Sequence, residues 1–490
     1  MQQAKILTKI SRRSFLNYSV ATALATTLGE LTFLQVGHSS SRPNILLITA
    51  DDLGQTLSCY GDKVARTPHI DRLASEGILF LNSYVTQASC SPSRSSLFTG
   101  LYPHQTGGTS NEPVGQIGLA YSNSGYSMAT SVVTLPQLLK AQGYRTGIIG
   151  KLHVYPETSF PFDVNVLPKA LNTRDVQLVA QHASEFFAQQ HEQPFFLMIS
   201  YNDPHTPFEA QFNNYPQQPY KSTEVPPFAW QGVDTPAMRE RTAGYYNGVA
   251  RLDAGIGLLL DQLAQQGLDQ NTLVIFLGDH GPGFFRAKGS CYEAGLRIPL
   301  IMRWFGRILP NQAEQAFVSN IDIFPTILQA AGLKTPKVSG RSLFPLFQQN
   351  LVGWRHFIFA EYTSHTRKDF YPRRSIRGKR YKLILNLLPE RQNPYINVDD
   401  DSAFVESRQL LLSNSARRAM DTCFRPPAEE LYDLQNDPYE FNNLAGKVGY
   451  QNIQKLLRNE LLNWRQQTAD PLLDPAVLAA MVKAHYGRKK

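Results

Sequence analysis

The chain has 490 residues, enough for one large hydrophobic core or for one large and one small core. Apolar residues make up 42% and charged residues 18%, as in ordinary soluble globular proteins, and the formal charge of +8 favours anionic partners only mildly. The sequence has no zinc-finger spacing, heptad array or internal repeat, so we expect no nucleic-acid partner, and its four cysteines do not indicate a disulfide scaffold.

Residues 1–41 are typical of an export signal. Residues 11–16, Ser-Arg-Arg-Ser-Phe-Leu, look like the twin-arginine motif, and a moderately apolar run follows from Phe15 to Leu28. The run is too short, and too soon interrupted by Glu30, to predict a membrane span. We expect the twin-arginine export machinery to carry the folded protein to the periplasm or the cell exterior. The alternative is a basic patch before an amphipathic helix.

Four short apolar runs are typical of strands that are buried on both faces of a sheet. They alternate with three segments that have the apolar spacing of amphipathic helices. The strands are predicted at residues 42–50, 146–150, 194–200 and 272–278, and the helices at 134–142, 173–190 and 239–267. This alternation indicates an α/β domain with a mostly parallel sheet.

Charged or imidazole side chains follow each of the four predicted strands. Asp51 and Asp52 follow the first strand, Lys151 and His153 the second, His205 the third, and Asp279 and His280 the fourth. In open α/β sheets ligands bind beyond the carboxyl ends of the strands. A single histidine or lysine after a strand is more often structural or solvated, but four such endings predict one site.

The aspartates of this group are suited to binding a metal ion. Asp51, Asp52 and Asp279 offer hard carboxylate oxygens, the ligands that Ca²⁺ and Mg²⁺ prefer. Paired aspartates after a strand also cap helices, which is the alternative for Asp51 and Asp52. Because Asp279 and His280 follow another strand of the same predicted sheet, we favour the metal site.

After about residue 350 the pattern changes to short strands with polar and basic surroundings. Strands are predicted at 356–361, 374–386 and 430–434, and a helix at 451–467. We therefore expect four parts: the signal region 1–41, an α/β domain at 42–354, a smaller α+β domain at 355–470 packed against it, and a tail at 471–490.

The stretch from Cys90 to Gly100 carries the most specific pattern of the chain. Cys-x-Pro-x-Arg followed by Leu-x-Thr-Gly resembles the signature of the type I sulfatases, and residues 288–299 and 430–445 also resemble sulfatase stretches. The resemblance covers roughly residues 42–465. It implies an alkaline-phosphatase-like α/β fold, in which helices sandwich a mostly parallel sheet, with a smaller C-terminal α+β domain.

The resemblance also implies a chemistry for the site. In type I sulfatases a formylglycine-generating enzyme oxidises the signature cysteine, and the hydrate of the resulting aldehyde attacks sulfur. A divalent cation, usually Ca²⁺, holds this residue and a sulfate oxygen. The implied metal positions are Cys90, Asp51, Asp52, Asp279 and His280, the last of which is often Asn in relatives. The implied catalytic positions are Cys90 as the nucleophile, Arg94 to orient it, His153 as the base and His205 as the acid. Lys151 and Lys288 are the implied cations around the sulfate.

Residues 147–163 look closest to the N-sulfoglucosamine sulfohydrolase (heparan N-sulfatase) subgroup. His365 and Arg374 match that subgroup as well, which implies that they contact the sugar. The chain departs from the subgroup at Thr366, where an acidic residue is usual and would read an amino sugar. The implied substrate is therefore a sulfated saccharide carrying an N-sulfate or an O-sulfate.

Three alternatives remain open from the sequence. The chain would be an O-sulfatase acting on another sulfated polysaccharide, a phosphonate monoester or phosphodiester hydrolase, or a sulfated-glycan-binding protein that does not turn over its ligand. The basic interval 367–382 is either an electropositive lip that attracts sulfated glycans or the solvated face of a strand pair.

Overall fold

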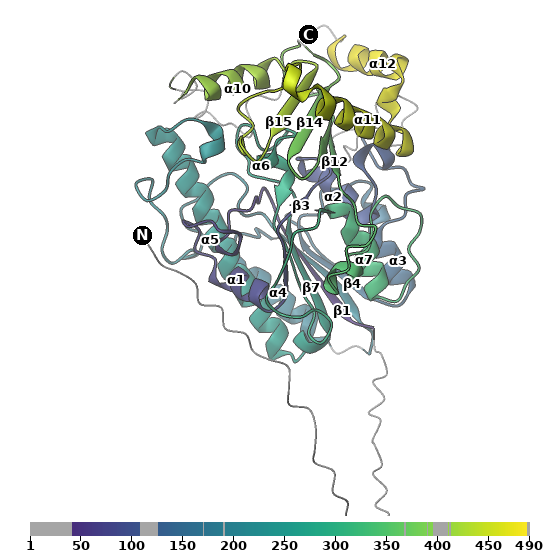
Figure 1. Ribbon diagram of the computed structural model, residues 1–490. Coiled ribbons are helices and arrows are strands. Elements are labelled where there is room, and N and C mark those ends of the chain that lie inside the picture. The colour runs from purple at the N-terminus through teal and green to yellow at the C-terminus, as the bar shows by residue number, and fades with distance from the viewer. Residues whose placement is uncertain are drawn as a thin grey trace, which may run out of the picture. The chain divides into compact units, whose positions relative to one another are not determined.

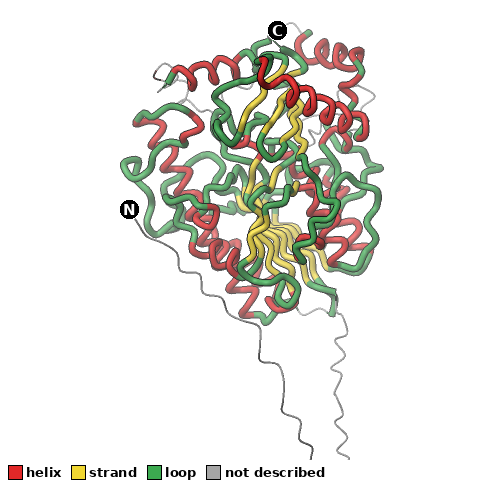
Figure 2. Tube along the Cα trace, viewed as in Figure 1, coloured by secondary structure: helices red, strands yellow, loops and turns green. Residues whose placement is uncertain are grey.

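An eight-stranded sheet forms the centre of the molecule (Figures 1 and 2). The computed structural model describes residues 42–107, 126–169, 171–189, 192–366, 369–389, 391–394, 410 and 413–487, so the predicted signal region lies outside the described residues. The sheet has the order β10-β2-β9-β7-β1-β6-β4-β5. Its strands are β1 (Asn44–Ala50), β2 (Ile78–Phe80), β4 (Arg145–Gly150), β5 (Val164–Val166), β6 (Phe195–Tyr201), β7 (Thr272–Gly278), β9 (Leu300–Arg303) and β10 (Gln312–Glu314).

The four predicted strands are consecutive neighbours inside this sheet and are called the central strands below. Strands β4, β6, β1 and β7 pair in parallel in that order, and every residue of β1, β4, β6 and β7 is buried. Continuous apolar runs fit these positions because helices cover both faces. Strand β9 runs antiparallel to β7 and β2, so the sheet is mixed but mostly parallel. The predicted fold class is confirmed.

Two layers of helices enclose the sheet, as Figure 1 shows. One layer contains α1 (Pro68–Ser75), α4 (Val176–Ala188) and α5 (Pro236–Gln265), and the other contains α2 (Cys90–Thr99), α3 (Leu135–Ala141) and α7 (Ile323–Ala330). The side chains of Asp175 and Thr235 accept a backbone hydrogen bond at the first turns of α4 and α5. The short elements β3 (Ser83–Tyr84), α6 (Glu293–Leu296), β8 (Arg297–Ile298), β11 (Val318–Ser319) and α8 (Phe344–Phe347) complete this part.

A second, antiparallel sheet follows in the chain. Its strands β12 (Ile358–Tyr362), β13 (Arg373–Arg377), β14 (Tyr381–Asn386) and β15 (Glu429–Asp433) lie in sequence order. Helix α11 (Gln451–Gln467) buries Leu457, Leu461 and Trp464 with Ile376 and Leu383 of this sheet. Helix α10 (Asn414–Phe424) precedes β15.

Two details of the C-terminal part differ from our expectations. The single strand predicted at 374–386 is a hairpin, because the chain turns between Arg377 and Tyr381 to pair β13 with β14. The segment 471–490 that we set apart as a tail contains helix α12 (Pro475–Tyr486), whose first turn is capped by Asp474. The domain boundary at residue 355 stays a prediction; residues 42–490 group into one compact unit.

The segments that follow the carboxyl ends of the central strands pack very closely. A Cβ atom on Gly278, the last residue of β7, would lie 2.2 Å from the carbonyl oxygen of Leu53. Only glycine therefore lets the segment after β1 cross the end of β7, which brings Asp51–Leu53 beside Asp279. Among the described residues, no helix has both the length and the apolar character to cross a membrane.

Candidate active site

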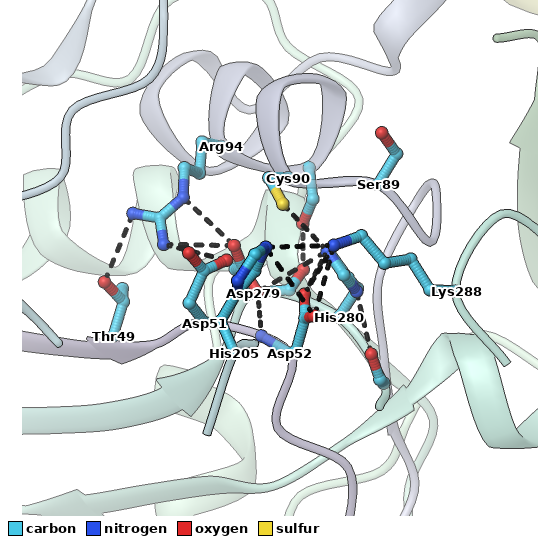
Figure 3. A network of polar contacts seen from close by, with 12 residues as sticks. Thr49, Asp51, Asp52, Ser89, Cys90, Arg94, His205, Asp279, His280 and Lys288 are labelled. Carbon is cyan, nitrogen blue, oxygen red and sulfur yellow. Dashed lines mark hydrogen bonds and ion pairs between the residues drawn. The ribbon is translucent and has the colours of Figure 1, made fainter. Parts of the chain in front are cut away.

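The guanidinium of Arg94 joins the ends of the four central strands (Figure 3). Arg94 lies on α2 and is completely buried. Its Nε donates to Asp279 Oδ2 at 3.0 Å, and its Nη1 donates to Ser200 Oγ at 2.7 Å and to the Lys151 carbonyl at 3.1 Å. Nη1 also lies 3.5 Å from Thr49 Oγ1. Arg94 thus contacts residues of β1 and β6 and residues directly after β4 and β7.

Cys90 begins helix α2 above this group of strand ends. Its Sγ lies 3.1 Å from His280 Nε2, and the residue is 2% exposed. Burial and the negative charge of Asp51 raise the pKa of the Cys90 thiol well above its usual value. Because the thiolate is the nucleophilic form of cysteine, the unmodified thiol is a poor nucleophile here.

Three buried carboxylates face Cys90. Asp51, Asp52 and Asp279 are at most 2% exposed, and the backbone N–H of Asp52 donates to Asp279 Oδ1 at 3.0 Å. Burial and the charge of Asp51 raise the pKa of Asp279. Burial would also raise the pKa of Asp51, but Lys151 and its cationic neighbours lower it well below the usual range.

Cationic side chains hold these carboxylates from two sides. Lys151 Nζ lies 2.6 Å from Asp51 Oδ2. Lys288 Nζ lies 3.1 Å from each carboxylate oxygen of Asp52, and Lys288 is 1% exposed. Lys288 is therefore not a solvated loop charge.

His205 and Lys288 form a hydrogen-bonded pair at the open side of the group. Lys288 Nζ lies 3.3 Å from His205 Nε2, which is 3.9 Å from Asp52 Oδ2. His205 Nδ1 lies 2.6 Å from the Thr206 carbonyl oxygen, so Nδ1 carries a proton and donates it in this bond. Nε2 is consequently the ring nitrogen that faces Lys288 and Asp52.

His153 interacts electrostatically with Lys151, Asp51 and Arg94. It adopts a left-handed backbone conformation with φ of 55°, two residues after Lys151 at the end of β4. Burial and the charge of Lys151 lower the pKa of His153 well below its usual value. The imidazole therefore stays neutral at neutral pH, the form that a base requires.

The residues fit a divalent cation. One oxygen each of Asp51 and Asp279, Cys90 Sγ and one His280 ring nitrogen lie within 4.8 Å of one another. The Oδ1 atom of Asp51 is buried and accepts no hydrogen bond from the described residues, and Arg94 Nη2 is 3.9 Å from it. Buried carboxylate oxygens without hydrogen-bond donors suit a cation that prefers oxygen ligands.

The orientation of His280 is fixed by its backbone neighbour. His280 Nδ1 donates to the Gly281 carbonyl at 2.8 Å, so Nε2 is the ring nitrogen that faces Cys90 Sγ and Asp52 Oδ1, at 3.1 and 3.2 Å. His280 is thus oriented as a ligand. An imidazole nitrogen is softer than the carboxylate oxygens around it.

The two residues expected to contact a sugar have different surroundings. His365 Nδ1 lies 2.9 Å from Ser89 Oγ, next to Cys90, so it is near the site. Arg374 is 1% exposed and pairs with both carboxylate oxygens of Asp470 at 2.9 Å. Its guanidinium is also 3.5 Å from Glu361. Arg374 therefore forms an internal ion pair that links β13 to the segment after α11, and its expected contact with a sugar stays a prediction.

The basic interval 367–382 does not form a continuous lip among its described residues. Arg373 and Lys382 are as buried as Arg374, and Lys382 Nζ pairs with Glu293 and Glu440 at 3.1 and 2.9 Å. Arg380 is exposed, but it pairs with Asp433. Among the described residues of the interval, Arg374, Arg377, Arg380 and Lys382 are thus paired with carboxylates.

Sequence reasoning missed the neutral partners of the site. Thr49 and Ser200 accept hydrogen bonds from Arg94, and the Tyr245 hydroxyl donates to the Asp52 carbonyl at 3.0 Å. The sequence does offer a signal for Thr49 and Ser200, because each is a hydroxyl residue near the end of an otherwise apolar run. Tyr245, within the long helix α5, gave no such signal.

Comparisons with known proteins show which families and structures the chain resembles. The model of the family described as Sulfatase matches residues 43–333, and that of N-sulphoglucosamine sulphohydrolase, C-terminal, matches residues 278–405. The human N-sulphoglucosamine sulphohydrolase is 32% identical over 488 residues, 89% of this chain and 93% of the human protein. An ulvan-active sulfatase of Formosa agariphila is 30% identical over 447 residues, 88% of this chain and 82% of that protein.

A solved structure in complex with its substrate D-glucosamine-2-N,6-O-disulfate is similar in fold. It superimposes with a TM-score of 0.64 over 88% of this chain and 99% of that chain, with 22% sequence identity. At this identity the likeness concerns the fold.

The hydrogen bonds and the ion pair of Arg94 lead to a prediction about stability. Arg94→Met leaves the buried Asp279 carboxylate without its main partner, so we expect a loss of about 3–5 kcal/mol in the free energy of unfolding. Urea unfolding in the presence of a chelator measures it, with Arg239→Met, which breaks an exposed ion pair with Asp234, as a control that should lose much less. Equal, small losses for both variants would show that Arg94 does not hold the strand ends together.

Proposed function

This chain belongs to the sulfatase family, and we propose that it hydrolyses the sulfate group of a sulfated saccharide, with N-sulfated glucosamine as the first candidate substrate. The observation that carries this proposal is the position of Cys90. It begins a buried helix, and its Sγ lies within 4.8 Å of a carboxylate oxygen of each of three aspartates and of a ring nitrogen of each of two histidines: Asp51, Asp52, Asp279, His205 and His280 (Figure 3).

The similarity to the human N-sulphoglucosamine sulphohydrolase supports N-sulfate as the first choice of linkage, because it extends over 89% of this chain and includes the C-terminal family region. The similarity to an ulvan-active sulfatase supports the second choice, an O-sulfated polysaccharide. Thr366, which replaces the expected acidic residue, keeps both linkages in the proposal.

The charge balance of the site favours an anionic ligand. The carboxylates of Asp51, Asp52 and Asp279 carry three negative charges. Arg94, Lys151 and Lys288 carry three positive charges, so these six groups are neutral together. A divalent cation adds two positive charges in a buried place, where a nearby anion offsets them more strongly than in water. A sulfate group supplies that anion.

Two further components complete the proposed chemistry. Oxidised to formylglycine by a formylglycine-generating enzyme, residue 90 supplies a hydrated aldehyde as the nucleophile, in the place that Sγ occupies in the structure. A Ca²⁺ ion held by Asp51, Asp52, Asp279 and His280 supplies charge stabilisation for the sulfate oxygens. Burial and Asp51 raise the pKa of the Cys90 thiol, so the unmodified residue is a poor nucleophile, and the proposal assigns the attack to its oxidised form.

The remaining side chains divide the proton transfers between them. The departing nitrogen or oxygen of the sugar takes a proton from the His205–Lys288 pair, in which the His205 side chain is 27% exposed. His153, kept neutral by burial and by Lys151, accepts a proton from the hydroxyl at residue 90. Lys151 and Arg94 neutralise the carboxylates that face the sulfate.

A substrate panel tests the proposed function. Protein co-expressed with a formylglycine-generating enzyme should release sulfate from N-sulfated glucosamine, and Cys90→Ala should release none because the nucleophile is missing. O-sulfated saccharides and a phosphodiester, assayed on the same preparation, separate the alternatives. Cleavage of only O-sulfated sugars would move the assignment to an O-sulfatase. Faster phosphodiester turnover, or saccharide binding without turnover, would overturn the proposal.

The metal site gives a second prediction. After dialysis against EDTA, added Ca²⁺ should raise the unfolding free energy, by about 2.7 kcal/mol at a concentration 100 times the dissociation constant. Asp51→Asn should lose this response, whereas Asp253→Asn, which alters a buried carboxylate that caps α1, should keep it.

The same titration tests the role of His280. His280→Asn replaces a borderline nitrogen with a hard oxygen, so it should still respond to Ca²⁺ and should bind Mn²⁺ less tightly than the wild type does. An unchanged Ca²⁺ response in Asp51→Asn would contradict the metal assignment.

We also propose export by the twin-arginine route to the periplasm or the cell exterior. The proposal rests on Arg12 and Arg13 and the apolar run that follows them. Changing both arginines to lysine should retain the protein in the cytoplasm, as cell fractionation would show. Unchanged export of that variant would contradict the route.

A further inference from the structure

The segment that carries His205 is held by a buried arginine outside the reaction centre. His205 lies in the connection after β6, and its side chain is 27% exposed. A side chain this exposed has few packing contacts to fix it, so its position depends on the backbone beneath it. That backbone is fastened by Arg174, which precedes helix α4.

Arg174 binds the connection at three points. Its Nη2 donates to the His205 carbonyl at 2.7 Å and lies 3.3 Å from the Pro207 carbonyl, while its Nε is 3.5 Å from Asp203 Oδ1. Arg174 is 7% exposed, so these contacts form away from water. The adjacent Thr173 accepts the Asn202 N–H through its hydroxyl at 2.9 Å. Thr173 and Arg174, which precede α4, therefore bind the backbone on both sides of His205.

Helix α5 holds the same connection from the other side. Arg251 pairs with both carboxylate oxygens of Asp203, at 2.7 and 2.8 Å, and both residues are 1% exposed. A Cβ atom on Gly248 would lie 3.0 Å from Pro204 Cα, so the connection packs tightly on the helix. Asp203 is thus held in place by α5, and Arg174 links Asp203 to the backbone of His205.

The consequence is a fixed direction for the His205 ring. Its Nδ1 is committed to the Thr206 carbonyl, within the segment that Arg174 holds. Its Nε2 is thereby directed toward Lys288 and Asp52, as Figure 3 shows. A displacement of about 1 Å at such a position is enough to cost a large factor in rate.

We propose that Arg174 is a positioning residue for the proton transfer to the departing sugar atom. The inference rests on the proposed function, in which His205 supplies that proton. When the bond from sulfur to the sugar nitrogen or oxygen breaks, the electron pair stays on that atom, which must be protonated. A leaving group that is stable as an anion has no such need. Loss of Arg174 should therefore slow only the reactions that require the proton.

The experiment compares two substrates on the modified enzyme. One is the saccharide sulfate that the wild type cleaves, and the other is 4-nitrophenyl sulfate, whose leaving group departs as a stable anion. Arg174→Gln should lower kcat on the saccharide by about 10- to 100-fold, part of the usual contribution of an acid, and should change kcat on the aryl sulfate much less. His205→Gln should show the same selectivity with a larger loss.

Arg145→Gln is the matched control. Arg145 is a buried arginine that also donates to a backbone carbonyl, that of Phe186 at 2.8 Å, but it lies at the opposite end of β4 from Lys151. Its loss should affect both substrates alike. Arg174→Lys, which keeps the charge, should recover part of the saccharide rate and serves if Arg174→Gln does not fold.

The outcomes distinguish a failure of the proposed function from a failure of the positioning role of Arg174. Failure of the wild type to release sulfate from any substrate contradicts the proposed function itself. Sulfate release with equal losses on both substrates for Arg174→Gln, as for Arg145→Gln, overturns the inference alone. A His205→Gln variant without selectivity overturns it too, because Arg174 would then have no proton donor to position.

Discussion

The buried guanidinium of Arg94 is the contact on which the rest of the site depends. Its donors reach Asp279, the Lys151 carbonyl, Ser200 and Thr49, and so span all four central strands. A buried charge is stable only when it is paired and hydrogen-bonded, and here the pairing groups come from strand ends far apart in the sequence. The same helix begins at Cys90, so the contacts of Arg94 hold Cys90 and the carboxylate of Asp279 in one buried group.

Opposite charges offset one another in this buried site. Three carboxylates crowded together would repel one another, and burial would raise their pKa values. Lysines and Arg94 offset this repulsion for Asp51, whose pKa is lowered, whereas the pKa of Asp279 stays raised next to Asp51. A cation and a sulfate would extend this alternation of charge. Binding of substrate and stability of the centre are therefore linked through the same few groups.

Much of the fold and site could be predicted because the evidence is local. Asp51 and Asp279 directly follow long apolar runs, and parallel strands place such endings at one edge. Other features depend on distant partners: Arg374 matched a family position, but Asp470, 96 residues away, takes it into an internal ion pair. Strands of two or three residues, such as β2 and β3, are too short for periodicity to identify.

The central claim is that Cys90 is the precursor of the nucleophile rather than the nucleophile itself. Peptide mass spectrometry across Cys90, on protein co-expressed with a formylglycine-generating enzyme, tests it most directly. The account predicts a peptide in which the thiol of Cys90 has been replaced by an aldehyde or its hydrate, with sulfate release that increases with the modified fraction. An unmodified thiol in a preparation that releases sulfate at full rate would contradict it.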